Sequence, residues 1–321
     1  MRVFVTGASG WIGSAATREL LDAGHQVVGL ARSDASAAKL EALGAEMLRG
    51  TIDDLDLVAR AAAEADGVIH LAFKHDIAFL GGSFQDAVDA DRRVVEAMGD
   101  ALKGSGKPFV LASGLLGVAP GRVATEEDGQ EPAAPQLDAA TLAALEASGL
   151  YRRDAWSRAD TAHYVRDLAG AEVRSSVVRL PPTNHGEGDH GFTASLVATA
   201  RSRGVAGYVG DGSQQWCAVH RLDSAHLFCL ALESAPAGAT LHAIADEGVP
   251  LREVAEVIGR HLGVPTASID PADAPEHFGW LARPASLACP ATSTITRELL
   301  GWRPTQVGLL EDLDQGHYFR L

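Results

Sequence analysis

Three glycines near the start of the sequence have the spacing of a phosphate-binding loop. The segment Thr6–Gly13 matches the pattern T-G-x-x-G-x-x-G and lies between an apolar run and a stretch of helical periodicity. Gly7 permits the tight turn, Gly10 lets a pyrophosphate approach the backbone, and Gly13 allows a helix to pack closely on a strand. The unpaired N–H groups of the first helical turn attract phosphate. The residues predicted to bind a dinucleotide here are Gly7, Gly10, Trp11, Ile12 and Gly13.

The residue expected to face the ribose of this dinucleotide is an arginine. Arg32 follows the second apolar run, about 20 residues after the glycine turn, where an acid would bind the 2′-hydroxyl of NAD. A guanidinium instead suits a 2′-phosphate, through paired and charge-assisted hydrogen bonds. We therefore predict NADP as the cofactor, with NAD as the alternative. A solvated arginine at the end of a strand is the other interpretation of Arg32.

Ser113 is the polar residue at the end of another apolar run, Pro108–Ser113. Ligands of open α/β sheets bind at the carboxyl ends of the strands. A hydroxyl in this position can orient the carbonyl or hydroxyl group of a substrate. We therefore predict that Ser113 is catalytic, and a simple cap of the strand is the alternative.

A glycine-rich segment in the second half of the chain gathers two imidazoles and two carboxylates. It reads His185-Gly-Glu-Gly-Asp-His190. The spacing fits no helical or finger-like set of metal ligands, and the glycines leave its geometry loose. We therefore predict that His185 and His190 contact the substrate or donate a proton, and that no metal binds here. Further along, Phe278 and Trp280 are expected to fill the core.

The elements that must position these residues alternate along the first half of the chain. Apolar runs predict strands at Arg2–Thr6, Gln26–Ala31, Glu46–Leu48, Gly67–Leu71, Pro108–Ser113 and Val173–Leu180. Helical periodicity between them predicts helices at Trp11–Ala23, Ser33–Leu43, Asp54–Ala65 and Ser83–Leu102. This alternation predicts an α/β fold, a Rossmann-type doubly wound sheet of parallel strands with helices on both faces.

The pattern changes after Leu180, where two prolines stop the strand. Shorter elements follow, and Leu241–Ala245 is a candidate for one more strand of the main sheet. We therefore predict a Rossmann domain at residues 1–180 that binds NAD(P). Residues 181–321 are predicted to form a smaller C-terminal α/β substrate domain, partly interwoven with the sheet.

The amino-acid composition excludes some classes of binding partner. Lys and Arg number 27 against 42 Asp and Glu, a formal charge of −15, which is the wrong sign for a general nucleic-acid binder or a protein held on an anionic membrane. The cysteines, Cys217, Cys229 and Cys289, lie far apart and form no C-x-x-C pair, so we interpret them as reduced packing residues. With no apparent signal peptide or membrane span, we expect a cytoplasmic protein with a small-molecule substrate; a homodimer is left open.

Five further segments carry motifs in a fixed order: Val68–Ala72, Phe109–Gly114, Val177–Pro182, Ala218–Asp223 and Leu300–Pro304. Together with the glycine loop they resemble the extended and atypical short-chain dehydrogenase/reductases, the NAD-dependent epimerase/dehydratase-like superfamily. The resemblance covers nearly the whole chain. It implies a Rossmann domain that binds a nicotinamide dinucleotide, followed by a substrate domain.

The resemblance also assigns roles to single residues. It implies that Leu71 and Ala72, at the end of the fourth strand, lie beneath the cofactor, and that Pro181, after the sixth strand, contacts it. Ser113 matches the catalytic Ser or Thr at the end of the family's fifth strand. The family's Tyr-x-x-x-Lys pair, in which Tyr moves the proton and Lys holds the nicotinamide ribose, does not occur in this sequence.

The register of the helix before the sixth strand places Arg158 where the family has Lys and Asp154 where it has Tyr. We expect a long helix from about Thr141 to Ala169. Tyr151, Asp154 and Arg158 follow at spacings of three and four, so they would share one helix face. We predict that Arg158 replaces the lysine, also as a cofactor ligand, and that Tyr151 or Asp154 handles the proton. A solvated Asp–Arg pair is the alternative.

Three functions are compatible with this sequence. The first is an NAD(P)-dependent oxidoreductase acting on a small carbonyl or alcohol. The second is a nucleotide-sugar epimerase or dehydratase, for which Arg201, Arg203 and Arg221 could contact a second pyrophosphate. The third is a non-catalytic module that binds NADP and reports on its level. We rank them in this order.

Overall fold

Seven parallel strands form the central sheet of the computed structural model, which describes residues 1–75, 83–130 and 157–320. The strand order is β10-β6-β5-β4-β1-β2-β3. The strands are β1 (Arg2–Thr6), β2 (Gln26–Ala31), β3 (Glu46–Arg49), β4 (Gly67–His70), β5 (Pro108–Gly114), β6 (Arg174–Leu180) and β10 (Ala239–His242). This order, with β1 between β2 and β4, is that of a Rossmann fold and confirms the predicted fold class.

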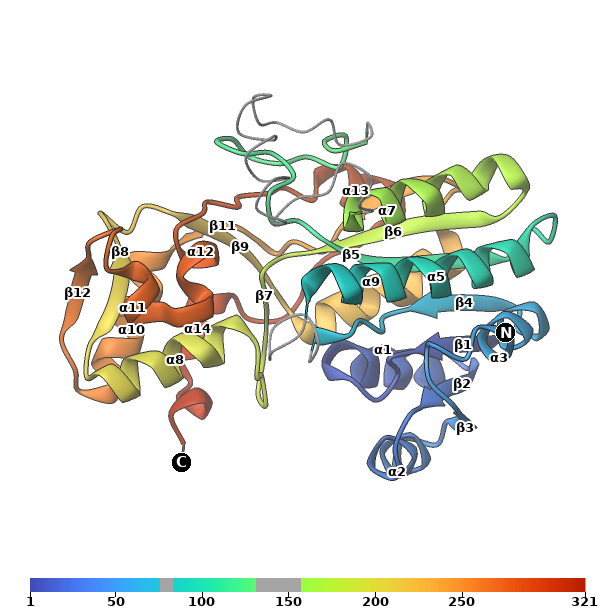
Figure 1. Cartoon of the computed structure of the whole chain (residues 1–321), viewed down its shortest axis with the longest axis horizontal. Helices are drawn as coiled ribbons and strands as arrows, with labels where there is room; N and C mark the ends of the chain where they lie inside the picture. The colour runs from blue at the N-terminus through green and yellow to red at the C-terminus, as the bar shows by residue number, and fades with distance from the viewer. Residues whose placement is uncertain (76–82, 131–156, 321) are drawn as a thin grey trace.

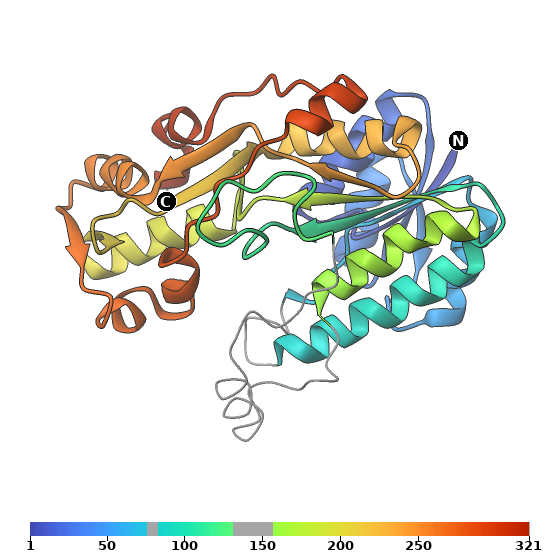
Figure 2. The same ribbon diagram turned by 90° about the horizontal axis from the view of Figure 1, so that it is seen from above.

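Helices cover both faces of this sheet (Figures 1 and 2). One face carries α1 (Trp11–Asp22), α2 (Asp34–Leu43) and α9 (Arg221–Ser234), and the other carries α3 (Leu55–Glu64), α5 (Phe84–Leu102) and α7 (Arg158–Asp167). Successive side chains of a strand point to opposite faces. In β1, Val3 and Val5 therefore pack in the core under α1 and α9, whereas Phe4 packs under α3 and α5.

A second lobe with a core of its own lies beside this sheet (left in Figure 1). We call it the C-terminal lobe, and the part built on the seven-stranded sheet the Rossmann lobe. Two small sheets of the C-terminal lobe join β7 (Thr183–His185), β9 (Gln215–His220) and β11 (Asp246–Pro250), and β8 (Ala206–Val209) with β12 (Thr266–Ile269). Its α-helices are α8 (Phe192–Arg203), α10 (Leu251–Leu262), α11 (Ala274–Phe278), α12 (Ala282–Ala285) and α14 (Leu309–Asp314).

The chain crosses between the lobes more than once. After β9 it returns to the Rossmann lobe as α9 and β10, and β10 pairs with β6 at the sheet edge. The predicted extra strand, Leu241–Ala245, is thus present but begins earlier, at Ala239. Helix α13 (Thr294–Leu300) packs on β10 and α9. Short 3₁₀ helices occur at η1 (Leu168–Ala171), η2 (Gly279–Leu281) and η3 (His317–Phe319).

The long helix predicted from about Thr141 is wrong at its start. Helix α7 begins at Arg158, because Ser157 has an extended backbone (φ −106°, ψ 167°) and caps the helix. The Ser157 hydroxyl accepts from the N–H of Asp160 (3.2 Å), and the Asp160 carboxylate accepts from the N–H of Ser157 (2.7 Å). This reciprocal capping box fixes the first turn. The residues from 131 to 156 lie outside the described part of the chain.

Two matched motifs have structural roles. Asp223 is buried, and its carboxylate accepts from the backbone N–H groups of Thr305 (2.9 Å) and Gln306 (3.1 Å). The indole of Trp302 donates to the carbonyl oxygen of Asp223 (3.1 Å). The start of α9 therefore anchors the segment that follows α13.

Within the described residues, no helix is both long enough and apolar enough to cross a membrane.

Candidate functional site

The glycine loop lies at the carboxyl end of β1 and packs against the residues that follow β4. Gly7 has φ +69°, and a Cβ there would lie 2.7 Å from the backbone nitrogen of Ala72. A Cβ on Gly13 would lie 1.9 Å from the carbonyl oxygen of Gly7. Gly7 and Gly13 are thus required by the fold of the loop itself, and the loop lies directly against Leu71 and Ala72.

Gly10 has a different role. It caps α1 with an ordinary φ of −76° and provides no side-chain hydrogen bond to the first turn. Its surface is exposed, and a Cβ there would approach only the carbonyl oxygen of Gly7, at 3.0 Å. The helix therefore presents N–H groups without a capping side chain beside an open backbone. This arrangement fits a pyrophosphate.

The edge of the sheet predicted to face the adenosine carries two arginines at the ends of neighbouring strands. Arg32 follows β2, and Arg49 ends β3, where it pairs in register with Ala31. Arg32 is exposed, and Arg49 is half exposed and forms an ion pair with Asp34 at 2.8 Å. No acidic residue occupies position 32, so this edge suits a phosphate on the ribose.

Lys74 and Asp53 connect the loop after β4 with the loop after β3. The Lys74 ammonium donates to both carboxylate oxygens of Asp53, at 2.7 and 2.8 Å. This pair lies on the same side of the sheet as the carboxyl ends of β3 and β4. It holds together the two loops that would flank an adenosine group.

Trp11 links the glycine loop to the C-terminal lobe. Its indole N–H donates to the carbonyl oxygen of Asn184 (2.8 Å), and the guanidinium of Arg221 lies 4.2 Å from its ring centroid. The ring of His190 meets it edge-on at 5.8 Å. The first residue of α1 thus sets how the C-terminal lobe approaches the predicted phosphate site. His190 is exposed beside it, so its predicted substrate contact remains a prediction.

Arg158 lies at the carboxyl end of β5, next to Ser113. Its Nη2 donates to the carbonyl oxygen of Ala112 (3.2 Å), the residue before Ser113. The guanidinium also lies 4.3 Å from the ring centroid of Phe73, in a cation–π contact. Ser113 is 7% exposed and faces Arg179 of β6 across the register of the sheet. The structure thus brings together Ser113 and Arg158, two of the residues predicted to be catalytic.

A buried polar chain behind this group was not recognised in the sequence. The Thr6 hydroxyl lies 2.6 Å from Nδ1 of His70, and Nε2 of His70 lies 3.1 Å from Asp91 of α5. Burial lowers the pKa of the Arg158 guanidinium, and the negative charge of Asp91 opposes this shift. The available signal was the place of Asp91 on the apolar face of α5, between Val88 and Val95.

The predicted stripe of Tyr151, Asp154 and Arg158 is only partly described. Tyr151 and Asp154 lie outside the described residues. Ser157 has an extended backbone and caps α7, which begins at Arg158, so the helical spacing used to group these residues does not extend across Ser157. Tyr164 points away from the site: its hydroxyl donates to Asp100 (3.3 Å) on α5.

His185 is not at the surface of the site, in contrast to its predicted contact with substrate. It is 0% exposed, and its Nδ1 lies 3.0 Å from the Asp312 carboxylate of α14. Its ring meets that of His220 edge-on at 5.4 Å. The reason is that β7 pairs with β9, which turns His185 into the interior of the C-terminal lobe. His185 is therefore a packing and hydrogen-bonding residue in this structure.

The arginines considered for a second pyrophosphate have other partners. Arg201 donates to the carbonyl oxygen of Phe319 (3.2 Å), and Arg203 donates to that of Glu276. Both lie in the last turn of α8, far along the helix from His190. Arg221 stacks on Trp11. These contacts give no support for a second phosphate site at any of the three arginines.

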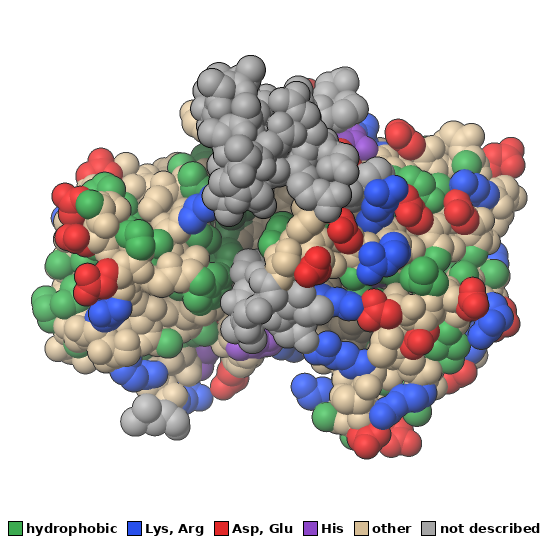
Figure 3. All heavy atoms as spheres, viewed as in Figure 1, with side chains coloured by type: hydrophobic (Ala, Val, Ile, Leu, Met, Phe, Trp, Pro, Cys, Tyr) green, Lys and Arg blue, Asp and Glu red, His purple; other side chains and the backbone are tan. Residues whose placement is uncertain are grey.

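The C-terminal lobe presents apolar side chains toward the waist between the lobes. Figure 3 shows hydrophobic groups there, whereas charges of both signs cover the Rossmann lobe. Phe192 opens α8 two residues after His190 and lies 5.3 Å from the ring of Trp280. Phe278 fills the core as predicted, but Trp280 is 47% exposed and does not. Leu116, three residues after Ser113, is also exposed.

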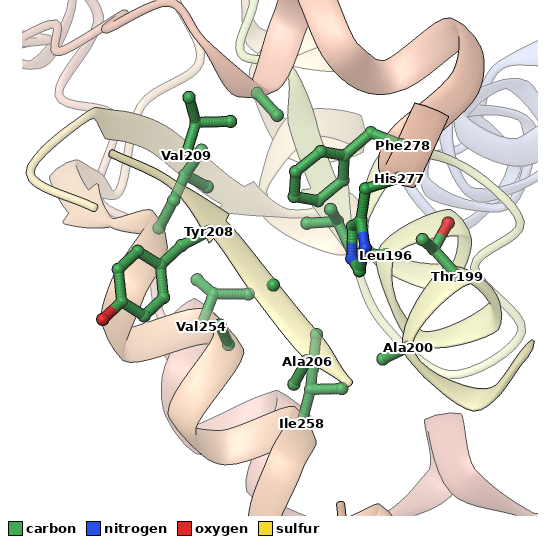
Figure 4. Close-up of a pocket in the computed structure, with 14 residues that line it drawn as sticks. Leu196, Thr199, Ala200, Ala206, Tyr208, Val209, Val254, Ile258, His277 and Phe278 are labelled. Carbon is green, nitrogen blue, oxygen red and sulfur yellow. The ribbon is translucent and has the colours of Figure 1, made fainter. Parts of the chain in front are cut away.

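The enclosed cavity inside the C-terminal lobe is too small to be the substrate site. Side chains of α8, β8, α10 and α11 line it, including those of Leu196, Tyr208 and His277 (Figure 4). Its volume is about 10 Å³, which is room for no more than one water molecule. It is a packing defect of the lobe, separate from the ends of the central strands.

Comparison with known proteins gives a family and full-length relatives. A model of the NAD dependent epimerase/dehydratase family matches residues 3–244. An uncharacterized protein of Schizosaccharomyces pombe is 42% identical over 99% of this chain and 100% of its own. An uncharacterized protein of Saccharomyces cerevisiae is 43% identical over 98% of each chain. A 2-alkyl-3-oxoalkanoate reductase of Stenotrophomonas maltophilia is 27% identical over 83% of this chain and 77% of its own.

A solved structure agrees with this fold. The dTDP-glucose 4,6-dehydratase DesIV from Streptomyces venezuelae, a double mutant with NAD bound, superposes with a TM-score of 0.71. The match covers 99% of this chain and 96% of that one, at 22% identity. At this identity the likeness concerns the fold, which includes both lobes.

Proposed function

The chain belongs to the NAD-dependent epimerase/dehydratase family, and on that premise we propose that it is an NAD(P)-dependent oxidoreductase acting on a small carbonyl compound or alcohol. The observation that carries this proposal is the contact of Arg158 with the carbonyl oxygen of Ala112 (3.2 Å), beside Ser113. It places a permanent cation and a hydroxyl at the end of a central strand, on the same edge of the sheet as the glycine loop.

The residues at this edge divide the work of binding and orientation. Gly7, Gly10 and the first turn of α1 would hold the pyrophosphate. When bound, the nicotinamide ring supplies or accepts a hydride. Arg158 would hold the ribose hydroxyls, as the family's lysine does in the resemblance, and Ser113 would donate a hydrogen bond to the substrate oxygen. Arg158 and Ser113 would thus orient the cofactor and the substrate, and their own positions are fixed by α7 and by β5.

The proton requires a different residue. Arginine stays charged at working pH, so Arg158 can lower the pKa of a neighbouring acid but cannot exchange protons itself. Tyr151 and Asp154 remain the proposed donors. In enzymes with a Tyr/Lys pair, that pair transfers the proton and holds the ribose. In this chain Tyr151 or Asp154 would transfer the proton, and Arg158 would hold the ribose.

We further propose that NADP is preferred over NAD. Arg32 and Arg49 place two guanidinium groups at the ends of β2 and β3, where the ribose of the adenosine would lie. A 2′-phosphate can accept paired hydrogen bonds from a guanidinium. The 2′-hydroxyl of NAD has no carboxylate partner at position 32.

An apolar substrate is favoured over a nucleotide sugar. The rings of Phe192 and Trp280 lie 5.3 Å apart, Trp280 and Leu116 are exposed, and Arg201 and Arg203 are bonded to carbonyl groups elsewhere. A nucleotide sugar would need cationic partners for its own phosphates. The name of the S. maltophilia relative, a 2-alkyl-3-oxoalkanoate reductase, is consistent with an alkyl ketone as substrate.

Oxidation of NADPH against a panel of ketones and aldehydes tests this function. We expect turnover that increases with the alkyl length of the carbonyl compound, and loss of turnover in Ser113→Ala with cofactor affinity retained. Ser175→Ala, a buried serine at the other end of the sheet, serves as the matched control. Cofactor binding without turnover on any carbonyl compound would contradict the proposal. It would favour the third candidate function, a non-catalytic module that binds NADP and reports on its level.

A further inference from the structure

A cluster of metal-ligating side chains lies where α1 ends against α9, away from the site described above. His25 belongs to the turn between α1 and β2, and Cys229 and Glu233 lie one turn apart on α9. One ligand atom of each residue lies within 4.8 Å of the others. Nε2 of His25 lies 2.9 Å from a carboxylate oxygen of Glu233. Residues distant in the sequence thus direct a nitrogen, a sulfur and an oxygen to one point.

The cluster is sheltered on one side and open on the other. The His25 side chain is 10% exposed, Glu233 is 37% exposed, and Cys229 is buried. One further ligand position therefore faces solvent. Turn and helix are both held in place by the packing of α1 on α9, which orients the ligand atoms without a metal.

The electrostatic field at this point favours a cation. The carboxylates of Glu233 and Glu19 both place negative charge near the Cys229 sulfur. Glu19 approaches from α1 and pairs with His226 of α9 at 2.7 Å. The same carboxylates that disfavour a bare thiolate would attract a divalent cation, whose charge reverses the balance at the sulfur.

We propose that His25, Cys229 and Glu233 form a zinc site, with water as the fourth ligand. A thiolate, a carboxylate and a neutral imidazole carry a charge of −2 together, so Zn²⁺ leaves the half-buried site neutral. On binding, the thiol proton passes to solvent, and the His25–Glu233 hydrogen bond is replaced by two bonds to the metal. His25 then carries its proton on Nδ1 instead of Nε2 and donates it to the Met1 amino group, 3.3 Å away, which releases one proton to solvent.

The spacing of the ligands is compatible with zinc geometry. Tetrahedral bonds of the usual Zn–N, Zn–O and Zn–S lengths put ligand atoms about 3.3–3.6 Å apart. The 2.9 Å separation of His25 and Glu233 would widen slightly, and the separations of up to 4.8 Å would shorten. Small changes of side-chain torsion at Glu233, whose carboxylate is partly exposed, can supply this adjustment.

The zinc would act as a structural link and not as part of the redox site. His25 precedes β2 at the amino ends of the strands, whereas the glycine loop, Ser113 and Arg158 lie at the carboxyl ends. The metal would tie the turn after α1 to α9, which itself carries the chain back from the C-terminal lobe. We therefore expect thermal stability, and not cofactor affinity, to depend on it.

Cobalt titration of the full-length protein, freed of any histidine tag and chelator, tests the site. Co²⁺ bound by a thiolate gives a sulfur-to-metal charge-transfer band in the near ultraviolet. We expect this band to saturate at one equivalent, to disappear on addition of Zn²⁺, and to be absent from Cys229→Ala. Cys217→Ala and Cys289→Ala, which remove the other two thiols, should keep it.

Two further variants keep the test decisive if Cys229→Ala does not fold. Glu233→Gln and His25→Gln, at the rim of the site, should weaken Co²⁺ binding at least tenfold and abolish the rise in melting temperature that Zn²⁺ causes. Glu253→Gln, an acid on α10, is the matched control and should change neither. The absence of a thiolate band in the unchanged protein, or a band that survives Cys229→Ala or is unaffected by Glu233→Gln, would overturn the proposal.

Discussion

Nη2 of Arg158 donates a hydrogen bond of 3.2 Å to the carbonyl oxygen of Ala112. This contact fixes a guanidinium at the end of β5, beside Ser113, where the family resemblance expects a lysine. The guanidinium also contacts the ring of Phe73, and the negative charge of Asp91 favours its charged form. Arg158 therefore puts a permanent positive charge at the end of β5, on a group that cannot transfer a proton.

Arg158→Ala should weaken the binding of the nicotinamide cofactor. A charge-assisted hydrogen bond contributes about 1.5–3 kcal/mol, or roughly tenfold to a hundredfold in affinity. Arg158→Lys keeps the charge and should lose much less. Titration of protein fluorescence with NADPH measures both; equal affinity in all three proteins would mean that Arg158 only packs α7 against β5.

Arg32→Ala should remove most of the preference for NADP over NAD. The loss expected for one charge-assisted contact is about tenfold to a hundredfold in NADPH affinity, with NADH affinity unchanged. Arg49→Ala should have an effect in the same direction, because Arg49 lies at the end of the neighbouring strand. Calorimetric titration with both cofactors decides this, and an unchanged protein that binds both equally would rule out the preference.

Two glycines of the loop should respond differently to substitution. Gly10→Val should abolish cofactor binding in a protein that still folds, because its Cβ would approach only one backbone oxygen, at 3.0 Å. Gly13→Ala should destabilise the fold by about 1–3 kcal/mol, because its Cβ would lie 1.9 Å from the Gly7 carbonyl oxygen. Thermal melts and cofactor titration of both variants separate the two effects. If Gly10→Val binds the dinucleotide with unchanged affinity, the loop has only a structural role.

Tyr151→Phe should lower turnover about 10²–10⁴-fold if this hydroxyl is the general acid, with little effect on cofactor affinity. Asp154→Asn is the matched test of the other proposed donor. The pH profile of turnover should lose its acid-donor limb in the variant that removes the donor. If both variants keep the turnover of the parent, His190 is the next residue to test.

Acid should destabilise the protein partly through His242. Its Nδ1 donates to the carbonyl oxygen of Thr292 (2.8 Å), and Arg179 lies 3.4 Å from Nε2, so the ring is held neutral. Burial lowers the pKa of His242 from 6.5 to about 4.

Because the unfolded histidine takes up a proton first, stability is full above about pH 6.5 and falls as the pH drops toward 4, by about 3 kcal/mol at most. Denaturant midpoints of His242→Gln should depend less on pH across this range than those of the parent, with half-exposed His226→Gln as control. Parallel pH dependences in all three proteins would exclude His242 as the sensor.

Local patterns were sufficient to predict the first elements of the Rossmann lobe. The apolar runs and the glycine loop act through neighbouring residues, so β1, α1 and β2 begin where the sequence indicates. The start of α7 was also encoded locally, since Ser157 and Asp160 have the spacing of a capping box. The helical periodicity upstream of Ser157 had predicted an earlier start, at about Thr141.

The rest depended on tertiary contacts. His185 is buried because β7 pairs with β9, and no spacing within His185–His190 contains that information. Trp280 is exposed because it follows a short helix at the lobe surface, which aromatic character alone does not predict. The contact of Arg158 with Ala112 joins residues 46 positions apart and required the register of α7 on β5. The resemblance predicts Arg158 at the position of the family's lysine, but it contains no information on the partners Phe73 and Asp91.

The most direct test of the account is the transfer of label from the cofactor to a product. NADPH carrying deuterium at C4 of the nicotinamide is incubated with an alkyl ketone, and the alcohol is examined by mass spectrometry. We predict one deuterium in the alcohol, formed by the unchanged protein and not by Ser113→Ala, while both proteins bind NADPH with similar affinity. An unlabelled alcohol, or no alcohol from any ketone despite bound NADPH, would contradict the assignment of an oxidoreductase at Ser113 and Arg158.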